Sequence, residues 1–296
     1  MSTASPSFNT IRDMLRLAVT RFNQAGVFFG HGSSNAFDEA AYLILSSLSL
    51  PLDKLDPFLD ARLTPEETAR IHMLIDRRVS ERIPAAYLTN EAWLQGYRFY
   101  VDKRVIIPRS FIAELIMEQF APWVENPEET ANILELCTGS GCLAIMMADA
   151  FPHAAIDAVD LSADALDVAR INVEEYRLEN RVTLIQSDLY EALPGKKYDL
   201  IVTNPPYVNN TSMQKLPREY QHEPQMALAG GDDGMDLVRT IVAQAGQYLS
   251  DEGFLVVEIG NEAAHAEAAF PHLELTWIST SGGDDRVFLV DAAQLR

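Results

Sequence analysis

Near its middle the sequence runs Ile133-Leu134-Glu135-Leu136-Cys137-Thr138-Gly139-Ser140-Gly141-Cys142-Leu143-Ala144. The apolar run at its start predicts a buried strand, and the apolar run at its end predicts the first turns of a helix. The two glycines between them allow backbone dihedrals that other residues avoid and let the backbone approach a ligand closely. Such a strand, turn and helix is typical of nucleotide-binding units. Ala144 stands where the dinucleotide pattern has its third Gly or an Ala, so this turn alone does not identify the nucleotide.

Strands and helices alternate along the rest of the C-terminal half. Strand patterns cover 132–137, 155–159, 182–186, 198–203, 253–259, 273–278 and 286–290, and helix patterns cover 141–150, 162–178 and 233–249. Strands separated by helices predict a parallel sheet with helices on both faces. The Gly-rich link Ser281-Gly282-Gly283 predicts that the last two strands form a hairpin at one edge. The expected fold class is therefore α/β, with a Rossmann-like, seven-stranded, mostly parallel sheet.

The first third of the chain has a different pattern. Residues 8–86 show helical periodicity without a strand signal, and Thr64-Pro65-Glu66-Glu67 is a helix start with a capping box. Residues 87–107 are aromatic or β-branched at approximately alternate positions, with a turn expected at Asp102-Lys103. We therefore expect a small helical domain at 1–86, a β-hairpin linker at 87–108, and the α/β domain at 109–296.

Composition excludes several classes of function. The net charge is −20: residues 1–90 hold nine basic and ten acidic side chains, and the remainder holds fourteen and thirty-three. Such a charge repels nucleic-acid phosphates, so no direct DNA binding is expected, and it attracts basic partners. No apolar run reaches the roughly 18–20 residues of a membrane helix, so we expect no membrane segment. The two cysteines favour a reducing cytoplasm, and no two of the six histidines have helical metal-ligand spacing, so we expect no metal.

Acidic side chains stand in or after three successive predicted strands. Glu135 lies in the first strand, where a carboxylate suits the cationic amino group of S-adenosylmethionine and would repel a pyrophosphate. Asp160 ends the second strand and can accept from both ribose hydroxyls, and Asp188 follows the third and can accept from the adenine amino group. Each acid alone is also compatible with a helix N-cap. The predicted cofactor-binding residues are Glu135, Cys137, Thr138, Gly139, Ser140, Gly141, Asp160, Asp188, Leu189 and Asn204.

A second motif, Asn204-Pro205-Pro206-Tyr207, follows the strand at 198–203. Two prolines stiffen the loop and fix the direction of its carbonyl groups. The Asn204 side-chain oxygen and the Pro205 carbonyl can accept both hydrogens of a planar amide or amino group and stabilise the charge that develops on its nitrogen. Tyr207 can stack on that planar group. We therefore predict Asn204, Pro205 and Tyr207 as catalytic residues and Asn204, Pro205, Pro206 and Tyr207 as substrate-binding residues.

Together these motifs resemble the class I, Rossmann-like methyltransferases that have a Gly-rich first motif and an Asn-Pro-Pro-Tyr fourth motif. That class contains adenine-N6 methyltransferases of nucleic acids and protein N5-glutamine methyltransferases. Three further stretches are similar to the second group: Arg82–Leu88, Ile107–Arg109 and Glu223–Gly234. The resemblance extends from about Gly30 to Arg286. It implies transfer of a methyl group from S-adenosylmethionine to the side-chain nitrogen of a glutamine.

Two stretches distinguish subgroups within this family. Release-factor enzymes carry Pro-Arg-Pro-(Asp/Glu)-Thr-Glu after the hairpin, whereas this chain reads Pro108-Arg109-Ser110-Phe111-Ile112-Ala113-Glu114. With His31–Ala40, this is similar to the enzymes that methylate the third protein of the 50S ribosomal subunit, which implies a basic ribosomal protein as partner and residues 1–86 as its recognition domain. A release factor and an adenine-N6 substrate remain alternatives, as does a non-catalytic binding module. Cys137 departs from the family pattern, which usually has Gly there.

Overall fold

The structure is a computed structural model that describes residues 9–193 and 195–296. Residues 1–8 of the predicted helical domain lie outside this range. The chain divides into two compact units, which are the described residues of Met1–Glu91 with Pro217–His222, and Ala92–Leu216 with Glu223–Arg296. The first unit thus contains a short segment from the C-terminal half, which the sequence did not predict. Among the described residues, no helix is both long and apolar enough to cross a membrane.

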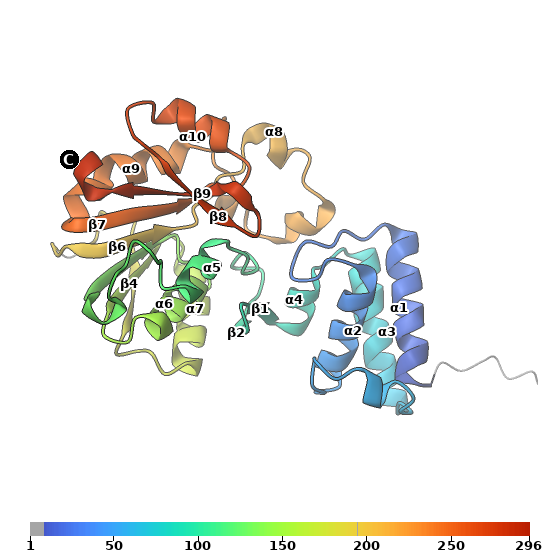
Figure 1. The fold of residues 1–296 in the computed structure, drawn as a ribbon. Helices are drawn as coiled ribbons and strands as arrows, with labels where there is room; N and C mark the ends of the chain where they lie inside the picture. The colour runs from blue at the N-terminus through green and yellow to red at the C-terminus, as the bar shows by residue number, and fades with distance from the viewer. Residues whose placement is uncertain (1–8, 194) are drawn as a thin grey trace, which may run out of the picture. The chain divides into compact units, whose positions relative to one another are not determined.

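The first unit is a small helical bundle, whose N-terminal helices are shown in blue and cyan in Figure 1. Its helices are α1 (Ile11–Ala25), α2 (Ala36–Ser47), α3 (Pro65–Ser80) and α4 (Ala85–Thr89), with the short 3-10 helices η1 (Asp56–Phe58) and η3 (Arg218–His222). The predicted capping box of Thr64 and Glu67 is confirmed, and Thr10 with Asp13 forms a second one. The core contains Met14, Phe22, Leu43, Ile44 and Ile75, all nearly inaccessible to solvent.

The linking hairpin is shorter than predicted. It consists of β1 (Glu91–Leu94) and β2 (Tyr97–Tyr100), joined by Gln95 and Gly96, both of which have positive φ. The predicted turn at Asp102-Lys103 is present, since the Val105 N–H donates to the Asp102 carbonyl at 3.1 Å, but it does not join the two strands of the hairpin. The Asp102 side chain accepts from the backbone N–H and the side chain of Arg104 in this turn. Tyr87 and Leu88 belong to helix α4, and residues 105–107 form no strand.

The second unit contains the predicted seven-stranded sheet, which is confirmed. Its strands lie in the order β5-β4-β3-β6-β7-β9-β8. Five neighbouring strands are parallel: β3 (Asn132–Leu136), β4 (Ala155–Asp160), β5 (Val182–Gln186), β6 (Tyr198–Thr203) and β7 (Leu249–Glu258). Strands β8 (Thr276–Thr280) and β9 (Gly283–Asp291) form the predicted antiparallel hairpin at one edge.

Helices cover both faces of the sheet (Figure 1). Helices α5 (Ile112–Met117), α6 (Cys142–Ala150) and α7 (Ala163–Glu175) pack on one face, and α9 (Asp236–Tyr248) and α10 (Ala263–Ala269) on the other. Alternate residues of β3 follow this division, since Ile133 enters one core and Leu134 the other. The remaining short elements are η2 (Pro127–Glu129), α8 (Asn210–Met213), η4 (Gln225–Ala227) and η5 (Ala292–Gln294).

The order of the strands places the candidate residues together. Strand β3 lies between β4 and β6, and the order of the strands reverses at this point: β4 and β5 follow on one side of β3, and β6 and β7 on the other. In open α/β sheets, such a reversal leaves a crevice at the carboxyl ends of the strands. The Gly-rich turn follows β3, Asp160 ends β4, and Asn204 follows β6. All three therefore lie at the same edge of the sheet.

Candidate active site

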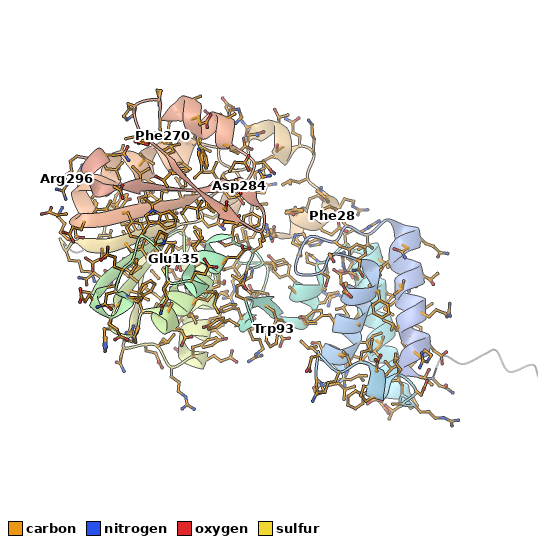
Figure 2. All side chains as sticks on the ribbon, in the orientation of Figure 1. Phe28, Trp93, Glu135, Phe270, Asp284 and Arg296 are labelled. Atoms are coloured by element: carbon orange, nitrogen blue, oxygen red, sulfur yellow. The ribbon has the colours of Figure 1, made fainter. Side chains whose placement is uncertain are left out.

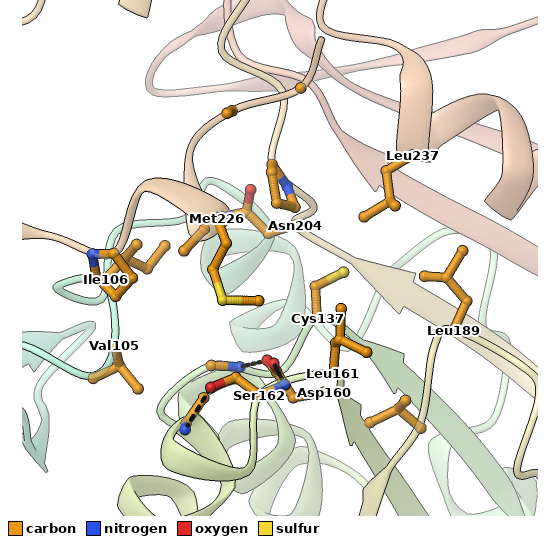
Figure 3. Close-up of a pocket in the computed structure, with 18 of the residues that line it drawn as sticks. Val105, Ile106, Cys137, Asp160, Leu161, Ser162, Leu189, Asn204, Met226 and Leu237 are labelled. Atoms are coloured by element: carbon orange, nitrogen blue, oxygen red, sulfur yellow. Dashed lines mark hydrogen bonds between the residues drawn. The ribbon is translucent and has the colours of Figure 1, made fainter.

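A cavity of about 260 Å³ lies at this edge, within the second unit (Figure 3). Seven of the sequence-predicted site residues line it: Cys137, Gly139, Asp160, Asp188, Leu189, Asn204 and Pro206. Sequence reasoning missed another group of lining residues, which includes Val105, Ile106, Leu161, Ser162, Met226 and Leu237. In Figure 3 the Met226 side chain lies between Ile106 and Cys137. No signal marked these residues, except that Leu161 directly follows the strand-end acid Asp160, as Leu189 follows Asp188.

The Gly-rich turn is held to the end of the next strand by Asp160. One carboxylate oxygen accepts from the Gly139 N–H at 2.8 Å, and the other accepts from the Ser162 N–H at 2.9 Å. Burial raises the pKa of Asp160. A carboxylate has about four lone-pair directions, so these two bonds leave acceptor capacity toward the cavity. Asp160 can therefore fix the turn and bind hydroxyl groups at the same time.

Cys137 occupies the turn with a left-handed backbone, φ 60°. This conformation favours glycine, which agrees with the residue that is usual here. The side chain lies between Asn204 and Leu189 on the cavity wall (Figure 3). Burial raises the pKa of its thiol, so the side chain stays protonated and contributes a weakly polar surface.

Glu135 does not line the cavity. Its carboxyl lies in the interior of the second unit (Figure 2), is 2% exposed, and accepts from the Thr138 hydroxyl at 2.6 Å. Burial raises the pKa of Glu135 to about 8. Thr138, Ser140 and Gly141 likewise shape the turn, and none of the three lines the cavity. The predicted contact of Glu135 with an amino group of the cofactor stays a prediction.

The backbone of Arg109 orients the Asn204 side chain. Its Nδ2 donates to the Arg109 carbonyl oxygen at 3.3 Å, which leaves Oδ1 as the acceptor of this side chain. The Arg109 guanidinium in turn makes two bonds of 2.6 Å to the carboxylate of Glu223. Glu223 also accepts from the Ile107 N–H at 3.0 Å. The stretches Ile107–Arg109 and Glu223–Gly234 therefore contact each other next to Asn204.

The backbone of Gly230 and Gly260 packs closely against Tyr207. A Cβ at Gly260 would come within 2.5 Å of the Tyr207 ring, and a Cβ at Gly230 would come within 2.7 Å of the Tyr207 Cα. Neither contact is compatible with a side chain. Next to Tyr207, Val208 forms a parallel β-bridge with Ala229. In this bridge the Val208 N–H donates to the Leu228 carbonyl, and the Gly230 N–H donates to the Val208 carbonyl. The loop after β6 is thus fixed by the glycines of the Glu223–Gly234 stretch.

The Tyr207 hydroxyl has a partner that the sequence did not reveal. It donates to Glu258 Oε1 at 3.4 Å, and Glu258 Oε2 accepts from the Ser110 hydroxyl at 2.6 Å and the Phe111 N–H at 2.9 Å. Glu258 is 1% exposed, and burial raises its pKa to about 7. An acidic residue at the end of a buried strand was the available signal. Ser110, which distinguishes this chain from the release-factor pattern, is therefore bound to the same carboxyl group as Tyr207.

The cavity presents several hydrogen-bond acceptors. Asp160, Asp188 and Asn204 offer oxygen atoms around one cavity, with apolar side chains between them. Within residues 9–193 and 195–296, no group of three His, Cys, Asp or Glu side chains is placed to hold a metal ion. The cavity can bind a molecule rich in hydroxyl and amino groups and can hold a planar N–H group beside Asn204.

Comparisons with known proteins give the family. The model of the methyltransferase small domain matches residues 113–220. A relative from Burkholderia pseudomallei, named ribosomal protein uL3 glutamine methyltransferase, is 59% identical over 302 residues, which cover 100% of this chain and 98% of the relative. Relatives of the same name from Bordetella pertussis and Neisseria meningitidis serogroup A are 60% and 57% identical, and cover 97% and 99% of this chain and 96% of each relative.

Among solved structures, the hMettl16 catalytic domain in complex with MAT2A 3′UTR hairpin 6 is 12% identical, with a TM-score of 0.50. It covers 77% of this chain and 81% of its own. This likeness concerns the fold alone, which is that of class I methyltransferases, as predicted. The predicted resemblance to protein glutamine methyltransferases is confirmed by the curated relatives, which align over almost the whole chain. This protein belongs to the family of ribosomal protein uL3 glutamine methyltransferases.

Proposed function

We propose that this chain transfers the methyl group of S-adenosylmethionine to the side-chain nitrogen N5 of a glutamine in ribosomal protein uL3. One observation carries the proposal beyond family membership. Asn204, whose amide nitrogen is held by Arg109, lines the same cavity as Asp160 and Asp188. An acceptor for an amide N–H therefore lies beside acceptors for a nucleoside.

The residues of the cavity fit S-adenosylmethionine. Asp160 and Asp188 can accept from the ribose hydroxyls and the adenine amino group, and Leu161, Leu189 and Leu237 offer apolar surface to a flat ring. S-adenosylmethionine supplies a methyl group on a positively charged sulfur, which is open to in-line attack. The protein's contribution is to hold the glutamine nitrogen in line with that group.

An amide nitrogen is a poor nucleophile because its lone pair is delocalised into the carbonyl group. Asn204 Oδ1 and the Pro205 carbonyl accept its two hydrogens and stabilise the positive charge that develops as the new bond forms. The Tyr207 ring, fixed by Gly260 and Glu258, stacks on the planar amide and favours the same charge. The nitrogen sheds a proton readily once it is alkylated, so no general base is required, and orientation supplies most of the rate.

Selection of the protein substrate requires a second surface, because the cavity contacts only an amide and a short stem. We assign this role to the helical domain, residues 1–86. A basic ribosomal protein also suits the net charge of −20, which attracts it over a long range. The curated relatives are named for uL3, which supports the same choice. The reaction is then expected in the cytoplasm, where ribosomal proteins are made.

The test is methyl transfer from labelled S-adenosylmethionine to unmethylated uL3, a release factor and duplex DNA, with the modified residue located by mass spectrometry. We expect one methyl group on one glutamine of uL3. Methylation of the release factor without uL3 would overturn the substrate assignment. Methylation of none of the three would overturn the proposed activity itself.

A further inference from the structure

A buried arginine lies at the centre of the helical unit. Arg78 of α3 is fully inaccessible to solvent, and its guanidinium binds two carboxylates that are almost as buried. Its Nε donates to Glu39 at 2.6 Å, and its Nη1 donates to Glu219 at 3.2 Å. A third bond, of 2.7 Å, runs from Nη2 to the Phe28 carbonyl. Glu39 belongs to helix α2 of the bundle, whereas Glu219 lies 141 residues beyond Arg78 in the sequence.

That segment, Pro217–His222, is tied to the helical unit at several points. Glu219 also accepts from the Phe28 N–H at 3.1 Å and from Arg82 at 3.4 Å. The Tyr220 ring lies 4.5 Å from His31 and 5.9 Å from Phe28, between ring centroids. His222 Nε2 lies 2.9 Å from the Glu81 carbonyl oxygen. Phe28 and His31 belong to the loop after α1, and His31 begins one of the two stretches that distinguish this subgroup.

Burying the side chains of Arg78, Glu39 and Glu219 together costs desolvation free energy. A buried ion pair often contributes less stability than apolar side chains of the same volume, so its benefit lies in fixing one arrangement. The planar guanidinium donates to carboxylates only in defined directions. Burial opposes ionisation at both carboxyl groups. At Glu39 burial dominates and raises the pKa. At Glu219 the hydrogen bonds from the Phe28 amide and Arg78 outweigh burial, and the pKa is lowered. The lowered pKa of Glu219 favours the carboxylate form that binds Arg78.

The chain on either side of this segment carries the reaction site. Tyr207 precedes it by ten residues, and Glu223 follows His222 directly. Glu223 binds Arg109, whose carbonyl orients Asn204. The loop between Tyr207 and Glu223 thus begins and ends in the second unit, whereas Glu219 within it is bound in the helical unit. Three residues, Tyr220, Gln221 and His222, separate Glu219 from Glu223.

We propose that Glu219 is a positioning residue that ties the loop after Asn204–Tyr207 to the substrate-recognition unit through Arg78. The loop that follows the proposed substrate-binding residues is thereby attached to the unit to which we assign recognition of the protein substrate. This inference rests on the proposed function. It assigns no contact with the reacting atoms to Glu219.

Glu39 provides a matched control, because it binds the same guanidinium at the same depth without belonging to the loop. In Glu219→Gln and in Glu39→Gln, Arg78 keeps one carboxylate and the Phe28 carbonyl, so both proteins are expected to fold. We expect S-adenosylmethionine affinity, measured by calorimetry, to stay within about twofold in both, since the cavity is untouched. We expect kcat/KM for uL3 to fall about tenfold or more in Glu219→Gln alone, because small misplacements of a substrate are costly.

A second measurement does not depend on turnover. Hydrogen exchange of the amides of residues 208–216 is expected to accelerate in Glu219→Gln and to stay unchanged in Glu39→Gln. Equal losses of kcat/KM in the two variants, or unchanged exchange in Glu219→Gln, would overturn the positioning role. If the wild-type chain methylates no substrate, the proposed function fails, and the exchange comparison still decides the role of Glu219.

Discussion

Arg109 and Glu223 form a two-pronged ion pair in which both N–O distances are 2.6 Å. The Glu223 side chain is fully buried, whereas that of Arg109 is 30% exposed. The pair joins two stretches that lie 114 residues apart, and the Arg109 carbonyl then binds the side chain of Asn204. The orientation of the Asn204 amide, which we propose to be catalytic, therefore depends on an ion pair that does not face the cavity.

The first prediction follows from this pair. Arg109→Lys keeps the charge but loses the planar fork, so one of the two bonds is lost and the Arg109 backbone shifts. We expect kcat to fall by about one to two orders of magnitude, the scale of a small misplacement of a catalytic group. The dissociation constant of S-adenosylmethionine should hardly change. Arg98→Lys, at an exposed ion pair with Glu175, is the control and should leave kcat unaltered. Equal kcat in wild type and Arg109→Lys would contradict the role of the pair.

The second prediction concerns the cofactor. Asp160→Ala should weaken S-adenosylmethionine binding by about 1.5–3 kcal/mol, because hydrogen bonds to a charged acceptor are lost. The same change removes the acceptor of Gly139 and Ser162, so part of the loss comes from the turn itself. Asp160→Asn keeps one oxygen and should fall between wild type and Asp160→Ala. Calorimetry measures all three, and equal affinity in all three with an intact fold would remove Asp160 from the site.

The third prediction concerns Asn204. Asn204→Ala should reduce turnover by about two to three orders of magnitude, the usual effect of losing one preorganised polar contact in a transition state. Cofactor binding should persist, because Asp160 and Asp188 remain. Single-turnover kinetics with saturating S-adenosylmethionine separates the two effects. A variant that loses its affinity for the cofactor while chemistry in the bound state continues would reverse this assignment.

The fourth prediction tests how Tyr207 acts. Tyr207→Phe should cost much less than Tyr207→Ala, because stacking requires the ring. The hydroxyl bond to Glu258 orients that ring, so Glu258→Gln should lower kcat in wild type and have little further effect in Tyr207→Phe. A double-mutant cycle on kcat measures this coupling. Fully additive losses would show that Glu258 acts through Ser110 and Phe111 alone, and an essential hydroxyl would replace stacking by a hydrogen-bonding role.

The sheet and much of the cavity could be predicted because their signals are local. The central strands β3 and β6 are mostly apolar runs, since both of their faces are buried, and Asn204 directly follows β6. Asp160 ends the neighbouring strand β4. The hairpin was misplaced because alternation continues past Tyr100, and Val105–Ile107 carries the same β-branched composition as a strand. The Ile107 N–H instead binds Glu223, which lies 116 residues further along the chain.

The remaining features depend on long-range pairs that no local pattern encodes. Arg78 stands in an ordinary amphipathic helix, and nothing near it indicates that Glu219 completes its burial. Pro217–His222 therefore could not be assigned to the helical unit from its sequence. Met226 and Ile106 line the cavity for the same reason, since the Glu223 ion pair brings both segments to the end of β6.

The last prediction concerns pH and Glu135. Burial raises the pKa of this carboxyl from its usual value of 4.5 to about 8. Because the folded state binds the proton more tightly than the unfolded state, the contribution of Glu135 to the free energy of unfolding is complete below about pH 4.5 and is lost as the pH rises through about 8. Glu135→Gln has no proton to lose, and its amide oxygen still accepts from Thr138. Urea unfolding at several values between about pH 5 and pH 8 should therefore show a steeper loss of stability in wild type than in the variant. The exposed Glu125, changed to Gln, provides the control, and its curve should follow wild type. Parallel curves for wild type and Glu135→Gln would mean that Glu135 is already ionised in the folded protein, and that Thr138 compensates its burial in full.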